Sequence, residues 1–118
     1  MTRIIVYTLR LVDGKFYVGS TPLWRKDVRL DEHMSGYGAK WTARYPPVLD
    51  DPIIETWVFQ TRKAALAFEN EKCEELLEMY GIDSTRGGLQ NYGQEGGYRW
   101  WVRSHLRHLV PADYDYNS

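Results

Sequence analysis

Cysteine is almost absent from this sequence, and its scarcity limits the classes of protein that fit. The chain has one cysteine, Cys73, so no disulfide can form within it. A single cysteine is typical of a reducing compartment, and Cys73 falls on the apolar stripe of a predicted helix, which favours a packed side chain over a nucleophile. One cysteine and three histidines also lack the spacing of a zinc finger. Composition therefore argues against a disulfide framework and a structural zinc site.

Long apolar runs are missing as well. No stretch approaches the roughly 20 residues with which a helix crosses a bilayer, and no signal-peptide pattern precedes the first predicted strand. We therefore expect an intracellular protein, cytoplasmic or nuclear, that has no membrane partner.

A strong net charge is the third absence. The formal net charge is -1 at pH 7, which argues mildly against a nucleic-acid partner, because a basic domain is the usual footprint of such a protein. The distribution of charge weakens that objection. Residues 1–47 hold eight Lys and Arg against four acidic residues, whereas residues 48–85 hold three against nine. The first segment is therefore locally basic.

The length allows one domain. With 118 residues, of which 43% are hydrophobic, the chain can bury a core of its own. We expect a core over residues 1–95, with a C-terminal helix and tail over residues 96–118 packed on the same domain. A separate recognition domain has no room, and the oligomeric state stays open.

Two apolar segments joined through Asp13 and Gly14 predict a β-hairpin. Residues 4–11 and 16–20 are rich in β-branched and aromatic side chains, and Asp-Gly is a strong turn signal. Because side chains alternate between the faces of a strand, the loop length decides the register. A two-residue turn would send the tyrosines of the two strands to opposite faces.

A three-residue loop gives the register that we predict. The loop Val12–Gly14, with its glycine in the left-handed conformation of a bulge, pairs Leu9 with Tyr17 and Tyr7 with Gly19. Both phenols then share a face beside an approachable glycine backbone, an arrangement that a phosphodiester site could use. The alternative is that tyrosine is simply a good strand residue.

Residues 23–35 predict a helix that follows Thr21–Pro22, with the threonine as N-cap and the proline as the first helical residue. Arg25, Arg29 and His33 recur at i, i+4 and i+8, so they line up along one side. A guanidinium can bind a phosphate through two hydrogen bonds, and an imidazole one turn away can donate another. A solvated basic face is the alternative interpretation.

The helix is expected to stop at Gly36–Gly38, and residues 39–47 predict a loop. Within it Lys40 and Arg44 alternate with Trp41 and Tyr45. Cations beside aromatic rings suit a nucleic-acid backbone and an unstacked base, although a loop that packs its own rings would look the same. Residues 53–59 then predict a third strand, apolar enough to lie against a core.

The pattern from Arg62 to Tyr80 predicts a helix, and one residue breaks its apolar stripe. Glu69 lies within the inward-facing stripe, whereas the other glutamates of this segment lie mostly on the outward side. A carboxylate that faces a core must be paired, hydrogen-bonded or bound to a metal. Glu69 is therefore either a candidate metal ligand or the partner of a buried arginine such as Arg29.

Beyond Gly81 the sequence turns loop-like. Arg86 followed by two glycines can offer a guanidinium and backbone amides to a phosphate, but a tight turn explains the same residues. Residues 98–109 predict a last helix, with an apolar stripe for the core and an arginine stripe that faces solvent, a duplex or a partner subunit.

The order of these segments resembles the GIY-YIG nuclease family from about Ile4 to Gly88. The matching motifs are Ile5-Val6-Tyr7 for Gly-Ile-Tyr, Tyr17-Val18-Gly19 with Ser20-Thr21 for Tyr-Ile-Gly and a small polar pair, Arg29 with His33, Gly36-Tyr37-Gly38-Ala39-Lys40-Trp41-Thr42 for Gly-x-Gly-Ala-Lys-x-Thr, and Ala65-Leu66-Ala67-Phe68-Glu69 for the segment with a metal-binding Glu. Each match is weak alone, but five in the right order are specific.

The resemblance implies an α/β (α+β) fold with a small three-stranded antiparallel sheet flanked by helices. It also implies metal-dependent hydrolysis of a DNA phosphodiester bond by water, with Mg²⁺ (or Mn²⁺) as the ion. On this sequence Glu69 would hold the ion, Tyr7 would act as general base or orient the water with support from Tyr17, and Arg29 would neutralise charge on the phosphate. His33 would steady the phosphate or assist proton transfer. A phenol has a pKa near 10, so the resemblance requires the ion or the guanidinium to lower it.

The remaining cations of the resembling region, Arg25, Lys40, Arg44 and Arg86, are the predicted DNA-binding residues. Ile5 replaces the first glycine of the family pattern, and the role of Asn91 stays open. Two other functions also stay open: a module that binds nucleic acid without cutting it, and a nuclease subunit whose protein partner supplies recognition.

Overall fold

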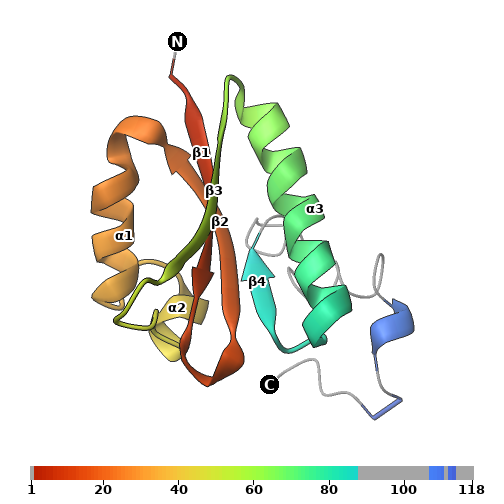
Figure 1. The fold of residues 1–118 in the computed structure, drawn as a ribbon. Helices are drawn as coiled ribbons and strands as arrows, with labels where there is room; N and C mark the ends of the chain where they lie inside the picture. Colours follow the sequence, from red (N-terminus) through yellow and green to blue (C-terminus); the bar gives the residue numbers. More distant parts are fainter. Residues whose placement is uncertain (1, 88–106, 111, 114–118) are drawn as a thin grey trace.

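The computed structural model describes residues 2–87, 107–110 and 112–113. Four strands form one sheet with the order β3-β1-β2-β4, and helices flank it on both sides (Figure 1). The strands are β1 (Ile4–Arg10), β2 (Phe16–Pro22), β3 (Ile53–Phe59) and β4 (Thr85–Gly87). The helices are α1 (Lys26–Met34), α2 (Lys40–Arg44) and α3 (Arg62–Tyr80), with 3-10 turns at Val12–Gly14, Leu23–Arg25 and Arg107–Leu109.

The predicted mixed fold is confirmed, but the sheet has four strands where three were expected. The extra strand is β4, which pairs in parallel with the first half of β2. Its glycine permits the close approach, because a Cβ at Gly87 would collide with the carbonyl oxygen of Val18. The prediction of a tight turn at Arg86 was therefore wrong. Three residues are too few to show a strand periodicity in the sequence.

The hairpin has the predicted register. Tyr7 lies opposite Gly19 and Leu9 lies opposite Tyr17 in the antiparallel pairing of β1 with β2. The loop Val12–Gly14 closes it, with φ of 61° at Asp13 and 70° at Gly14. Glycine adopts this left-handed conformation without a Cβ penalty, so the loop sequence fixes which side chains share a face.

Two local predictions between the hairpin and β3 were wrong. The cap and first helical residue predicted at Thr21–Pro22 are the last residues of β2, since Ile5 and Ile4 pair with them and extend the strand. The segment predicted as a loop over residues 39–47 contains the short helix α2. Its N-cap is Ala39, whose backbone N–H donates to the Thr42 hydroxyl at 3.1 Å. Sequence patterns for helix starts look for Ser, Thr or Asp at the N-cap, so they do not detect this one.

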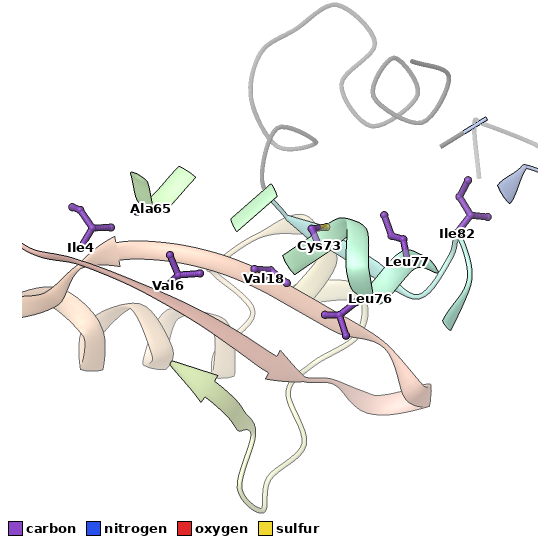
Figure 2. Close-up of a cluster of buried hydrophobic side chains, with 8 residues drawn as sticks. All are labelled: Ile4, Val6, Val18, Ala65, Cys73, Leu76, Leu77 and Ile82. Carbon is purple, nitrogen blue, oxygen red and sulfur yellow. The ribbon is translucent and has the colours of Figure 1, made fainter. Parts of the chain in front are cut away.

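Alternation along the strands divides the core between the two faces. Ile4, Val6 and Val18 face α3 and pack against its buried residues Ala65, Cys73, Leu76 and Leu77, together with Ile82 (Figure 2). On the opposite face Tyr7, Leu9, Leu11 and Tyr17 are buried among side chains of α1 and α2, including Leu30 and Trp41. Cys73 is fully buried, as a packed side chain should be.

Helix α3 has the predicted bounds. Thr61 caps it by accepting the backbone N–H of Ala64 at 3.1 Å, and Gly81 ends it with φ of 99°. The apolar stripe does not stay buried to the end of the helix: Tyr80, in the last turn, is 56% exposed, and its ring centroid lies 5.0 Å from that of Phe16.

Most of the last predicted helix, residues 98–106, lies outside the described residues, as does Asn91. Residues 107–109 form a 3-10 turn. Among the helices that the structure describes, none has the length and apolar character needed to cross a membrane.

Candidate active site

Tyr7 and Tyr17 lie together on the sheet face that α1 and α2 cover. Their ring centroids are 6.4 Å apart, and both side chains are buried. A Cβ at Gly19 would come within 2.6 Å of both the phenolic oxygen of Tyr7 and the ring of Tyr17. The prediction that the two phenols share a face beside a glycine backbone is confirmed.

His33, in the last turn of α1, packs against both phenols. Its ring centroid is 5.7 Å from that of Tyr7 and 4.9 Å from that of Tyr17, and its side chain is fully buried. Nε2 lies 2.8 Å from the Tyr7 oxygen, and Nδ1 lies 2.9 Å from the Thr42 hydroxyl. Gly38 packs so closely on the imidazole that a Cβ would overlap it. The solvated basic face considered for this helix therefore does not include His33.

The contacts of Thr42 favour one tautomer of His33. The Thr42 hydroxyl donates to the carbonyl oxygen of Ala39 at 3.1 Å, which uses its one proton. With the proton placed there, its oxygen accepts from the Ala39 backbone N–H and from His33 Nδ1–H. Neutral His33 consequently has a lone pair on Nε2, and that lone pair accepts the hydrogen bond that the Tyr7 hydroxyl donates.

Burial decides the protonation of this pair. Burial, with the added effect of Arg29, lowers the pKa of His33 to about 4, so the imidazole is neutral at pH 7. Burial also raises the pKa of Tyr7 above its ordinary value, and Tyr17 and Glu69 act in the same direction. Arg29 acts to lower the pKa of Tyr7, the direction that the resemblance requires, but burial outweighs it.

Arg29 is the cation that interacts electrostatically with the phenol of Tyr7. Burial acts to lower the pKa of its guanidinium, but Tyr7, Tyr17 and Glu32 outweigh burial and raise it. Glu32, one turn along α1, accepts from Arg29 at 3.3 Å and binds Arg25 through two contacts of 3.1 and 3.2 Å. Two of the predicted phosphate-binding cations are thus held by one carboxylate.

Glu69 approaches the cluster from the other face of the sheet. It projects from α3, is 2% exposed, and accepts a hydrogen bond of 2.8 Å from the Ser20 hydroxyl. Ser20 follows Val18 by two residues and therefore faces α3, whereas Gly19 faces the phenols. The predicted inward direction of Glu69 is confirmed.

Glu69 and the two phenols approach the same part of β2, at Gly19 and Ser20, from opposite faces of the sheet. β4 pairs with β2 from Phe16 to Val18, and within the described residues no strand continues this pairing beside Gly19 and Ser20. The edge of β2 at that point lies between Glu69 on one face and the phenols on the other. The negative charge of Glu69 reaches Tyr7 strongly enough to act on its pKa, which places both groups in one electrostatic environment.

Comparison with known proteins gives one relative. A UPF0213 protein of Halalkalibacterium halodurans is 34% identical to the chain over 83 residues, which cover 64% of this chain and 83% of that protein. The chain belongs to the UPF0213 family. No family model matches the sequence, and no solved structure matches it. The relative's name states no activity, so the capability of this UPF0213 chain rests on its own side chains.

The residues of the UPF0213 chain fit a divalent ion that arrives with a phosphate. Across residues 2–87 and the described C-terminal positions, no three His, Cys, Asp or Glu side chains gather into a metal site. Glu69 is one buried carboxylate, and Mg²⁺ commonly binds one or two carboxylates together with waters and substrate phosphates. The donor set suits that open mode of binding and does not form a closed protein cage.

The other predicted cations do not join the phenols. Lys40 is exposed on α2. The Arg44 guanidinium lies 5.3 Å from the centre of the Tyr45 ring, and the Arg86 guanidinium lies 4.2 Å from the centre of the Trp41 ring. The rings of Trp41 and Tyr45 pack together with centroids 4.7 Å apart, and nucleic-acid contacts of Lys40, Arg44 and Arg86 stay a prediction.

Sequence reasoning missed three residues of the site: Thr42, Ser20 and Glu32. The first two stand inside motifs already noted, at the end of the Gly-x-Gly-Ala-Lys-x-Thr stretch and in the small polar pair after Gly19. Glu32 is three residues after Arg29, a spacing at which helical ion pairs form. Each residue therefore lies in a recognisable sequence pattern, but the pattern does not predict which distant residue it contacts.

Proposed function

We propose that this UPF0213 protein is a metal-dependent endonuclease of the GIY-YIG type that hydrolyses DNA phosphodiester bonds. The observation that carries the proposal is the buried hydrogen-bonded chain from Tyr7 through His33 to Thr42, beside the Arg29 guanidinium. The imidazole is neutral and buried, and its Nε2 lone pair accepts from the phenol. A proton-transfer site needs that arrangement.

The Tyr7–His33 pair supplies the base. As a water oxygen attacks phosphorus, the water gives a proton to the Tyr7 oxygen, and the Tyr7 hydroxyl gives its own proton to Nε2 of His33. The phenol therefore relays a proton without first becoming a phenolate, which its raised pKa disfavours. A phosphate bound at Arg29 adds negative charge beside the imidazole and raises the pKa of His33 from about 4 in the free protein.

Arg29 and Tyr17 act on the phosphate and on its geometry. The Arg29 guanidinium, kept charged by its neighbours, compensates the charge that develops on the phosphate oxygens. Tyr17 packs against the rings of Tyr7 and His33 and keeps the relay aligned. The bond from phosphorus to the leaving oxygen then breaks, and that oxygen takes a proton from solvent.

Glu69 would hold Mg²⁺ or Mn²⁺, with the Ser20 hydrogen bond fixing its carboxylate. Such an ion, when bound, polarises the phosphate and stabilises the leaving oxygen. This assignment gives a role to a buried carboxylate on the inward face of α3.

End-labelled DNA of several shapes tests the proposal: supercoiled plasmid, linear duplex, a flap and a four-way junction, each with Mg²⁺ or with EDTA. We expect Mg²⁺-dependent cuts that Glu69→Gln and Arg29→Ala each reduce by a factor on the order of 100 or more. Glu71→Gln is the matched control, because it neutralises an exposed carboxylate on the same helix. Circular dichroism must show that every variant is folded.

Three results would contradict the proposal as stated. Full activity in folded Glu69→Gln or Arg29→Ala would remove that residue from the site. No cutting of any shape, together with DNA binding that ignores Mg²⁺, would favour the non-catalytic module, and cutting restored by an added cellular partner would favour the partner-dependent subunit.

A further inference from the structure

A cavity lies between the hairpin loop, α2 and β4. It has a volume of about 170 Å³, and its lining combines three cations with two aromatic rings and one carboxylate: Lys15, Arg44, Arg86, Trp41, Tyr45 and Asp83. These residues come from the hairpin loop, α2 and its end, and the entry to β4, so the cavity is formed by segments that are distant in sequence. None of them belongs to the Tyr7–His33 relay.

The two rings hold the cations in place. Trp41 and Tyr45 pack with centroids 4.7 Å apart, and the Trp41 indole N–H donates to the Phe16 carbonyl oxygen at 2.9 Å, which fixes the pair on the sheet. Arg86 lies over the Trp41 ring at 4.2 Å, and Lys15 lies over the Tyr45 ring at 5.2 Å. The aromatic faces are thus used to position positive charge.

Backbone contacts add to this positioning. The Lys15 ammonium donates to the carbonyl oxygen of Asp83 at 2.9 Å, and the Arg86 guanidinium donates to the carbonyl oxygens of Ile82 and Thr85 at 3.1 and 2.9 Å. Three cations and the carboxylate of Asp83 leave the lining with a formal charge of +2. Cations that are already ordered lose little conformational entropy when they bind an anion.

The cavity lies on the same face of the sheet as the relay. Arg86 is paired with Tyr17 in the parallel ladder, and Trp41 precedes the Thr42 that holds His33. From Phe16 to Gly19 the strand rises ~10 Å at 3.3 Å per residue. A DNA strand carries a phosphate at every nucleotide, so one strand can contact both the cavity and the relay.

We infer that this cavity binds a backbone phosphate of the DNA strand close to the bond that is cut. The inference rests on the proposed function for the choice of strand, whereas the phosphate chemistry follows from the lining alone. A phosphodiester carries one negative charge, which suits the excess of positive charge in the lining. The pocket thereby sets where along the strand the relay acts.

The test uses full-length protein carrying Glu69→Gln, which prevents cutting, and a flap DNA whose branch point fixes the register. Single phosphates are replaced in turn by neutral methylphosphonates, and binding is followed by fluorescence anisotropy. We expect one or two adjacent positions to weaken binding about three- to tenfold. Adding Arg44→Ala should weaken binding to unmodified DNA by a similar factor and abolish the effect of those methylphosphonates.

The salt dependence and a matched control complete the test. Arg44→Ala should reduce the slope of log affinity against log salt by about 0.7–0.9, the loss of one phosphate contact. Lys63→Ala removes an exposed cation from the first turn of α3 and should leave both the slope and the methylphosphonate pattern unchanged. Lys15→Ala is the second pocket variant, in case Arg44→Ala alters α2, and the same pattern is expected.

Three outcomes would overturn the inference. The methylphosphonate pattern could be identical with and without Arg44 and Lys15. Arg44→Ala and Lys63→Ala could reduce binding equally, which would show only a diffuse charge effect. Inorganic phosphate or a free 5′-mononucleotide could occupy the pocket without displacing DNA, which would assign the site to a free nucleotide. Because binding is measured, loss of the pocket and loss of the nuclease remain separate results.

Discussion

The Tyr7 phenol lies over the backbone of Gly19, its partner across the hairpin, so closely that a Cβ on the glycine would come within 2.6 Å of the phenolic oxygen. The same Cβ would meet the ring of Tyr17 at 2.6 Å. The glycine thus leaves the space in which both phenols lie. Because the phenolic oxygen bonds to His33, moving the ring would also break the proposed relay.

Gly19→Ala should therefore inactivate the enzyme before it unfolds it. Overpacking of this kind costs about 1–3 kcal/mol, and we expect cleavage to fall on the order of 100-fold because Tyr7 is displaced. Cleavage assays and urea denaturation measure the two effects. Gly36→Asn is the control, since a side chain there meets nothing within 4 Å and Asn tolerates the φ of 83°. Equal activity of both variants would contradict the assignment.

Thr42 controls the tautomer of His33, and its variants separate this role from packing. Thr42→Val keeps the shape but removes the acceptor for Nδ1–H, so the imidazole loses the contact that reserves Nε2 for Tyr7. We expect kcat to fall about tenfold or more with little change in KM. Thr42→Ser should restore most of the rate. A valine variant with the wild-type kcat would show that Thr42 does not position the histidine.

The low pKa of His33 makes stability depend on pH. The folded chain protonates His33 near pH 4, whereas the ordinary value is 6.5, so the unfolded chain binds more protons between these values. The free energy of unfolding therefore rises with pH across this window and is lost as the pH falls. Relative to His33→Gln, the wild type should lose on the order of 2 kcal/mol between pH 6.5 and pH 4. Urea titrations at each pH measure it, and parallel curves for the two proteins would refute the burial of a neutral imidazole.

Glu32 competes with phosphate for two guanidiniums. It contacts Arg25 at 3.1 and 3.2 Å and Arg29 at 3.3 Å, and these contacts lower its pKa. Glu32→Gln should strengthen DNA binding about threefold or more at low salt, because an anion next to the binding cations is removed. We expect kcat to fall at the same time, since Arg29 loses a contact that orients it. Weaker binding in this variant would mean that Glu32 organises the site without opposing the substrate.

The features that the sequence predicted well are those that depend on local backbone rules or on a broken pattern. A three-residue hairpin loop requires a left-handed residue, and Gly14 supplies it. That loop length fixes the register that pairs Tyr7 with Gly19. Glu69 interrupted an apolar stripe, so its burial could be inferred before any partner was known. The bounds of α3 followed from nineteen residues of periodic sequence.

The features that escaped prediction depend on contacts between distant segments. β4 has three residues, and its parallel pairing joins positions about 70 residues apart, for which no local pattern exists. The raised pKa of Tyr7 arises from burial under α1, and burial is a property of the assembled layers. The same holds for Thr42, whose hydroxyl can orient the imidazole only when Ala39 and His33 are both within hydrogen-bond distance.

The placement of Glu69 and His33 on opposite faces of the sheet makes the proposed activity depend on the cooperativity of the fold. Glu69 belongs to the layer of α3, and His33 belongs to the layer of α1, so the proposed machinery exists only while both helices are docked on the sheet (Figure 1). Either helix can detach in a partial opening that leaves the other layer native. Turnover should then be lost at a lower urea concentration than the helical circular dichroism signal. The proposed activity would therefore report whether both helices are docked on the sheet.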